Sequence, residues 1–141
     1  MDHVVYVDSK SKDLEKLIDE TKTMIIRGAA GRKLPYGRVN ISDILYFINN
    51  NGEGKIKASA VVKDVYNSDK MTKEESIALV EKNQDKLQLT NKQFSRWAGK
   101  RYLVLIKVEN VQVIKSFGIN RSDYGKMDDW LPVEDINKVK L

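Results

Sequence analysis

The run from Arg101 to Ile114, RYLVLIKVENVQVI, constrains the fold most because it is the longest strand signal in the chain. Four shorter runs rich in β-branched and aromatic residues precede it, at residues 3–8, 21–27, 41–49 and 55–66. Five such runs predict a β-sheet whose strands supply most of the core.

Two of these runs are predicted to form a hairpin. The segment NNNGEG, polar and glycine-containing, separates residues 41–49 from residues 55–66. In the second run apolar side chains alternate with other residues and are expected to share one face: Ile56, Ala58, Ala60 and Val62.

Three helices are predicted, and all are short. The first lies within residues 9–20, with Ser9 or Ser11 as its N-cap. The others cover residues 73–87 and 91–98. Capping boxes open these two: Thr72 with Glu75, and Thr90 with Gln93.

The order of these elements predicts an α+β fold. Short crossovers and hairpins favour a mixed, curved or barrel-like sheet over a doubly wound one. A length of 141 residues is expected to form a single domain, residues 1–141, and the tail at residues 117–136 is expected to be turn-rich.

Composition excludes several kinds of site. The chain has no cysteine and one histidine, His3, so disulfides, thiolate zinc sites and histidine-pair metal sites are excluded. His3 is expected to be exposed or packed rather than catalytic. No apolar run approaches the ~18 residues that span a bilayer. We therefore expect no metal, no cofactor, no membrane partner and a cytoplasmic location.

Positive charge is concentrated in two windows, residues 21–42 and 86–108. The net charge is +5 and the sequence pI is about 9.3. The two windows hold eleven of the 25 Lys and Arg residues and none of the 20 acidic residues. If the fold brings them together, they would form a surface that binds polyanions in a salt-dependent way. Alternatively, the cations are scattered over solvated faces.

The first window contains a basic, glycine-rich loop, RGAAGRKLPYGR, at residues 27–38. Its Gly28-Ala-Ala-Gly31 step has the G-x-x-G form that KH domains use on nucleic-acid backbones, but those loops join two helices and this one joins two strands. Glycines beside Arg32 and Lys33 would let amides and cations approach a phosphate. Equally, a surface crossover needs glycine for its backbone angles.

The segment Leu14–Val65 resembles the PUA-like superfamily, especially its ASCH branch. Those domains show a helix, a strand with G-x-K-T-x-E-x-R, a basic loop and a strand of the form GDxLxF. Lys22, Thr23 and Arg27 stand at the matching Lys, Thr and Arg positions, and SDILYF matches the second motif. The family's Gly, Glu and Gly are replaced by Glu20, Ile25 and Ser42.

This resemblance implies a mixed β pseudo-barrel flanked by short helices, with the basic loop at the rim of a ligand cleft. PUA-like domains are implicated in binding RNA or modified bases. Some ASCH-type members are hydrolases that use lysine and carboxylate groups. Loss of the motif acid at Ile25 disfavours that activity here.

The candidate nucleic-acid-binding residues come from both windows and the tail. Lys22 and Arg27 are five apart, so an undistorted strand would point them to opposite faces. Tyr36 is a stacking candidate by exposure, Trp97 alternatively anchors the core, and Trp130 either closes the cleft or pins the tail. The full set is Lys22, Arg27, Arg32, Lys33, Tyr36, Arg38, Arg96, Trp97, Lys100, Arg101 and Trp130.

Three functions remain open from the sequence. The first is binding of RNA, or of a modified nucleobase, by a basic surface and a small cleft. The second is an ASCH-type amide or nucleoside hydrolase, with Lys22 as nucleophile or base, Thr23 as its partner and a carboxylate from Asp43 or Asp129. The third is a protein-interaction module that presents the helices of residues 72–98.

Overall fold

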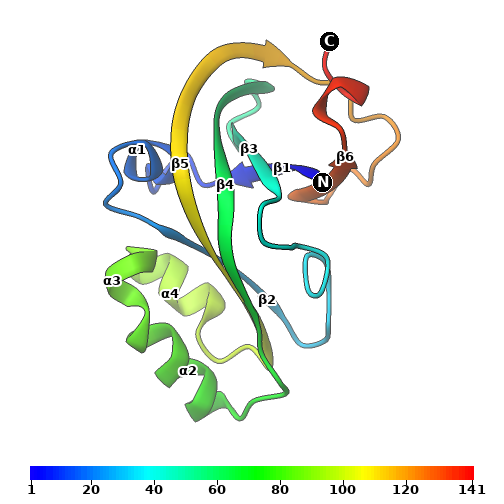
Figure 1. Cartoon of the computed structure of the whole chain (residues 1–141). Coiled ribbons are helices and arrows are strands. Elements are labelled where there is room, and N and C mark those ends of the chain that lie inside the picture. The colour runs from blue at the N-terminus through cyan, green and yellow to red at the C-terminus, as the bar shows by residue number, and fades with distance from the viewer.

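The computed structural model describes residues 1–141 and contains one six-stranded sheet with four short helices (Figure 1). The strand order is β2-β5-β4-β3-β1-β6. The strands are β1 (Asp2–Val7), β2 (Met24–Ala29), β3 (Ile44–Asn49), β4 (Lys55–Asn67), β5 (Tyr102–Gly118) and β6 (Trp130–Glu134). The helices are α1 (Asp13–Ile18), α2 (Lys73–Lys82), α3 (Gln84–Leu87) and α4 (Asn91–Trp97), with a 3₁₀ turn at Ile136–Lys138.

The sheet is mixed and curled into a half-barrel. Strands β1 and β3 pair in parallel, while every other neighbouring pair is antiparallel. The pairing of β4 with β5 shifts register at three places, and such bulges bend a strand and increase its twist. In Figure 1 the long β5 arches over the sheet. The predicted α+β, barrel-like architecture is therefore confirmed.

Apolar side chains fill both sides of the curled sheet. The inside of the curve buries one cluster, which includes Leu17, Ile25, Phe47 and Ile106. Helices α2 to α4 cover the opposite face around β2 and β5, where Trp97 packs with Leu103 and its neighbours. The predicted hairpin of β3 and β4 is confirmed, and the four apolar side chains of β4 that were predicted to share one face are all buried.

Three local predictions need correction. Neither Ser9 nor Ser11 caps α1, which begins after Lys12 in a left-handed conformation at φ 58°, while the Ser11 hydroxyl donates to Asp8. The predicted helix 73–87 is divided into α2 and α3 at Asn83. The tail contains β6, which adds to β1 at the sheet edge. Both predicted capping boxes are present.

Gly28 is packed closely against its neighbours in the sheet. It lies in β2, where an added Cβ would stand 2.5 Å from a methyl group of Leu103 and 3.0 Å from the carbonyl oxygen of Tyr102. At Gly31 an added Cβ would meet nothing within 4 Å. The two glycines of the G-x-x-G step therefore have different surroundings.

We expect Gly28→Ala to lower the free energy of unfolding by about 1–3 kcal/mol, the usual range for overpacking a core. The matched variant Gly31→Ala is expected to change it by less than about 0.5 kcal/mol, as is usual for surface positions. Urea denaturation of both variants measures the difference. Equal stability of the two would contradict this assignment.

Candidate functional site

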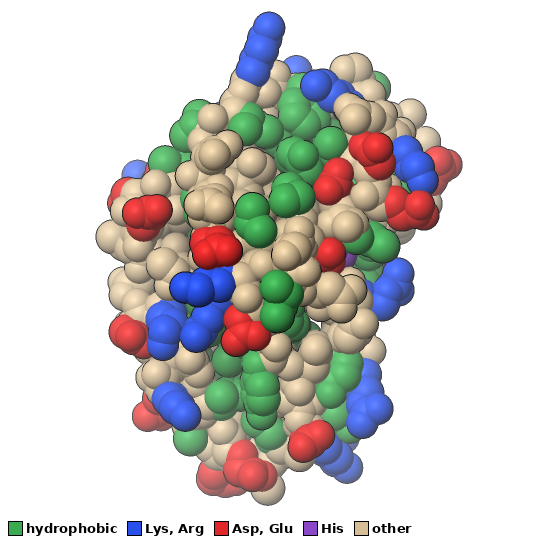
Figure 2. All heavy atoms as spheres, in the orientation of Figure 1, with side chains coloured by type: hydrophobic (Ala, Val, Ile, Leu, Met, Phe, Trp, Pro, Cys, Tyr) green, Lys and Arg blue, Asp and Glu red, His purple; other side chains and the backbone are tan.

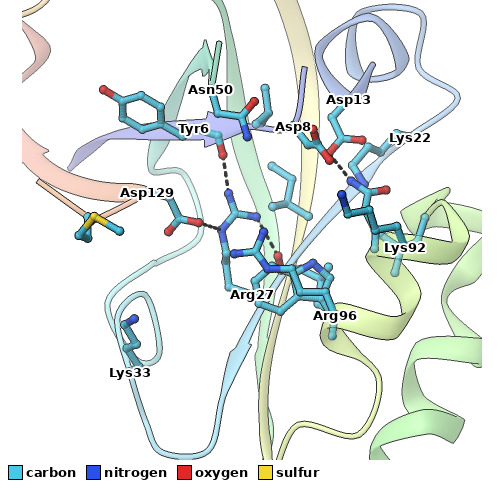
Figure 3. Close-up of a pocket in the computed structure, with 17 residues that line it drawn as sticks. Tyr6, Asp8, Asp13, Lys22, Arg27, Lys33, Asn50, Lys92, Arg96 and Asp129 are labelled. Atoms are coloured by element: carbon cyan, nitrogen blue, oxygen red, sulfur yellow. Dashed lines mark hydrogen bonds and ion pairs between the residues drawn. The ribbon is translucent and has the colours of Figure 1, made fainter. Parts of the chain in front are cut away.

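A cavity of about 530 Å³ opens where β1, the start of β2 and α4 meet (Figure 3). Side chains from both basic windows line it, so the fold brings the two windows together. Its cationic side chains are Lys22, Arg27, Lys33, Lys92 and Arg96, and its acidic ones are Asp8, Asp13 and Asp129.

A second cavity of about 300 Å³ adjoins the first. The two share Arg27, Lys33, Arg96, Trp97 and Asp129, and the second adds Lys100. We call the two together the basic cleft. The face seen in Figure 2 instead carries Lys and Arg interspersed with Asp and Glu. The excess of positive charge is thus not distributed evenly over the surface of the molecule.

Lys22 lies on the floor of the larger cavity. Lys22 lies before the first residue of β2, so the alternation of side chains along a strand does not apply to it. Lys22 and Arg27 therefore both line the cleft and do not point to opposite faces. The side chain is 3% exposed, and its Nζ donates to the carbonyl oxygen of Leu87 at 2.5 Å. Burial lowers the pKa of Lys22 to about 8, against the opposing effect of the Asp13 carboxylate.

Asp13 and Gln93 complete the floor, and both were missed as site residues. The Gln93 amide is oriented by the capping box of α4, where its Oε1 accepts from the Thr90 backbone N–H at 3.0 Å. Its Nε2 therefore faces Asp13 and donates to Oδ2 at 2.9 Å. The other oxygen, Asp13 Oδ1, is buried and has no partner. It is a free acceptor beside the Lys22 donor.

Arg27 forms a fixed wall of the cleft. Its guanidinium donates to the carbonyl oxygens of Tyr6 at 2.6 Å and Ile26 at 2.9 Å, and its Nε lies 3.4 Å from Asp129 Oδ2 (Figure 3). The group also lies 6.0 Å from the ring centroid of Trp97 and 5.6 Å from that of Trp130. Burial lowers the pKa of Arg27, and Asp129 opposes that effect.

The rim carries three exposed cations without an acidic partner. Lys33, Arg96 and Lys100 form no ion pair, although Arg96 lies over the Trp97 ring at 4.4 Å. They stay available for an anionic ligand. Lys92, another exposed lining residue of the second window, was not among the candidates.

The remaining aromatic and basic candidates lie outside the basic cleft. Tyr36 is half-buried, with its hydroxyl donating to the Ser68 carbonyl oxygen at 2.5 Å. Trp130 is 1% exposed and belongs to the core, so it fixes the tail to the sheet. Arg32 lies over the rings of Tyr36 and Tyr102, while Arg38 and Arg101 are exposed elsewhere.

The hydrolase candidates are only partly brought together. Thr23 does not line the basic cleft but a different cavity, which Lys22 also lines. Asp43 binds His3 and does not line the cleft, and Asp129 lines it but pairs with Arg27. Asp13 is instead the carboxylate beside Lys22. No group of three or more His, Cys, Asp or Glu side chains could hold a metal ion, and no helix has the length and hydrophobicity that a membrane crossing needs.

Comparison with known proteins identifies structures with a similar fold. No model of a protein family and no curated protein matches the chain. A crystal structure of ASCH from Zymomonas mobilis matches with a TM-score of 0.70 and 13% identity, over 97% of this chain and 92% of that one. Structures of two of its point mutants match equally well. The chain therefore has the fold seen in these ASCH structures.

Proposed function

We propose that this chain binds RNA, or a modified nucleobase, in its basic cleft. The observation that carries the proposal is the meeting of residues 21–42 and 86–108, the two windows without acids, around one cavity. Sequence-distant cations gathered at one opening attract a phosphate backbone.

The cleft has a different chemistry at its floor and at its rim. On the floor the charges of Lys22 and Asp13 offset one another, and the pair offers both hydrogen-bond donors and an acceptor. Such a floor suits an uncharged heterocycle such as a base. The rim cations Lys33, Arg96 and Lys100 suit the neighbouring phosphates.

The size of the cavity favours an unpaired nucleotide. About 530 Å³ lies within the range of small-molecule sites, too small for a duplex but sufficient for one base and its sugar. A base can enter only when it is free of its pairing partner, as in single strands or loops. The proposed ligand is therefore single-stranded.

Titration of a labelled single-stranded RNA at several salt concentrations tests the proposal. Three phosphate contacts predict a slope of log K against log salt of roughly −2. We expect Lys33→Ala, Arg96→Ala and Lys100→Ala each to reduce this slope. Arg38→Ala and Arg101→Ala are matched controls, because these exposed cations come from the same windows but lie outside the cleft. Equal losses for all five variants would count against a localised site.

A second candidate function is hydrolysis of an amide on a nucleoside. It is favoured by one observation, the Lys22 amine whose pKa falls to about 8 beside the carboxylate of Asp13. An amine with that pKa is partly neutral near pH 7 and can serve as nucleophile or base. Turnover of acylated nucleosides that is lost in Lys22→Ala would support it. No turnover across a broad panel would exclude it.

A further inference from the structure

A buried hydrogen-bond chain runs behind the wall of the basic cleft. His3 is 0% exposed, and its Nε2 lies 2.8 Å from Asp43 Oδ2. Its Nδ1 lies 3.1 Å from the indole Nε1 of Trp130, which is itself 1% exposed. The two rings meet edge-on, with centroids 5.8 Å apart. This chain links the start of β1, the segment before β3 and β6.

The chemistry of the two partners fixes the protonation state of His3. An indole N–H can only donate, so Nδ1 must be the acceptor, and the ring proton must lie on Nε2 and be donated to Asp43. His3 is therefore neutral in this arrangement. Burial lowers its pKa; Asp43 and Asp2 act to raise it, and the amino group of Met1 to lower it.

Trp130 transmits this arrangement to the cleft. Its ring centroid lies 5.6 Å from the Arg27 guanidinium. The preceding residue, Asp129, pairs with Arg27 through its carboxylate and accepts the Tyr6 backbone N–H at 2.9 Å through its carbonyl. The Tyr6 carbonyl oxygen in turn accepts from Arg27. A shift of Trp130 would therefore disturb several contacts of the wall at once.

We propose that His3 is a positioning residue for the basic cleft, whose neutral ring holds Trp130 and, through it, the Arg27 wall. Protonation of Nδ1 sets an N–H against the N–H of Trp130. The hydrogen bond is lost and the wall loosens. The cleft then binds nucleic acid more weakly in acid. This inference rests on the proposed function.

The sign of this effect separates it from simple electrostatics. Lys22, with a pKa of about 8, gains its remaining protons as the pH falls to 7, and other cations stay charged. Added positive charge strengthens polyanion binding, so a cleft that did not depend on neutral His3 would bind RNA equally or more tightly in acid. Weaker binding at pH 5.5 than at pH 7.0 would therefore indicate that protonation of His3 disturbs the cleft.

The experiment measures the dissociation constant of a labelled oligouridylate at pH 7.0 and 5.5 and constant ionic strength. Uracil does not titrate in this range. We expect a loss of affinity at pH 5.5 relative to pH 7.0, because protonation of the His3 ring competes with ligand binding. Circular dichroism confirms that the fold persists at pH 5.5.

Two variants test the route. His3→Gln removes the titrating ring, and its affinity should not change between the two pH values. If it fails to fold, Trp130→Phe keeps a ring under Arg27 but removes the indole N–H, so it should also abolish the pH dependence. A wild-type pH dependence that survives in Trp130→Phe would overturn the proposal.

A readout without ligand distinguishes this proposal from the proposed function. The Trp130 indole N–H resonance of the free protein should move with the titration of the His3 ring, and the Trp97 indole should not. If RNA binds equally at both pH values and this resonance stays fixed, the proposed role of His3 is wrong while the proposed function stands. If RNA does not bind at either pH, both are wrong.

Discussion

Arg27→Ala is expected to weaken RNA binding by at least about tenfold and to destabilise the fold. The tenfold loss corresponds to about 1.4 kcal/mol, within the range for a hydrogen-bonded charge. The substitution also leaves the carbonyl oxygens of Tyr6 and Ile26 without their donor. Each buried acceptor left unpaired costs about 1–3 kcal/mol.

Arg27→Lys is the matched control for this prediction. A lysine keeps the positive charge but cannot donate to both carbonyl oxygens and pair with Asp129 in one plane. We expect binding to be weakened in Arg27→Lys as well, and stability to be partly restored. Anisotropy titration and urea denaturation measure the two effects. Full binding by Arg27→Ala would show that the wall of the cleft does not contact the ligand.

Lys22→Met is expected to lower RNA affinity more than it lowers the free energy of unfolding, although it leaves the Asp13 carboxylate without the nearby positive charge. Methionine preserves most of the buried volume, and it removes a charge whose burial opposes folding. The lost donor to Leu87 acts in the other direction, so we expect the free energy of unfolding to change by less than about 1.5 kcal/mol. RNA affinity should fall about tenfold, because the floor loses its cation.

The pH dependence of stability and of RNA affinity in the wild-type protein also tests the role of Lys22. The pKa of Lys22 is lowered in the folded protein, so between about pH 8 and 10.5 the unfolded chain binds more protons than the folded one. The Lys22 contribution to stability therefore rises with pH in this window. Affinity for oligoadenylate, whose bases do not titrate there, should instead fall from pH 7 to 9. Lys22→Met should show neither change.

The sequence was sufficient for the architecture because local signals agreed with the sheet. Alternation in β4, two capping boxes and the length of β5 each specify an element from its own residues. Strand β6 was missed because Trp130–Glu134 is short, contains Pro132 and is defined by its pairing with β1. Such pairing is a tertiary property that no local pattern records.

The cations at the rim of the candidate site could be predicted from the sequence, but the residues of its floor could not. The two windows identified the cations of the rim, since charge patterning is visible in one dimension. Asp13 and Gln93 are 80 residues apart and meet only through packing of α1 near α4. Gln93 already had a role in the predicted capping box of the last helix. Tyr36 is half-buried instead of exposed, because it packs on Tyr102 and bonds to Ser68, neighbours that the sequence alone does not reveal.

The first experiment is a titration with single-stranded RNA and with duplex DNA, followed by tryptophan fluorescence. Trp97 lines the basic cleft and Trp130 lies against Arg27, so a ligand in the cleft should alter their emission. We expect a saturable change with RNA whose affinity falls steeply from low to physiological salt, and a weaker response to duplex DNA. No change with either polymer at low salt would contradict the claim that the two basic windows form a nucleic-acid-binding cleft.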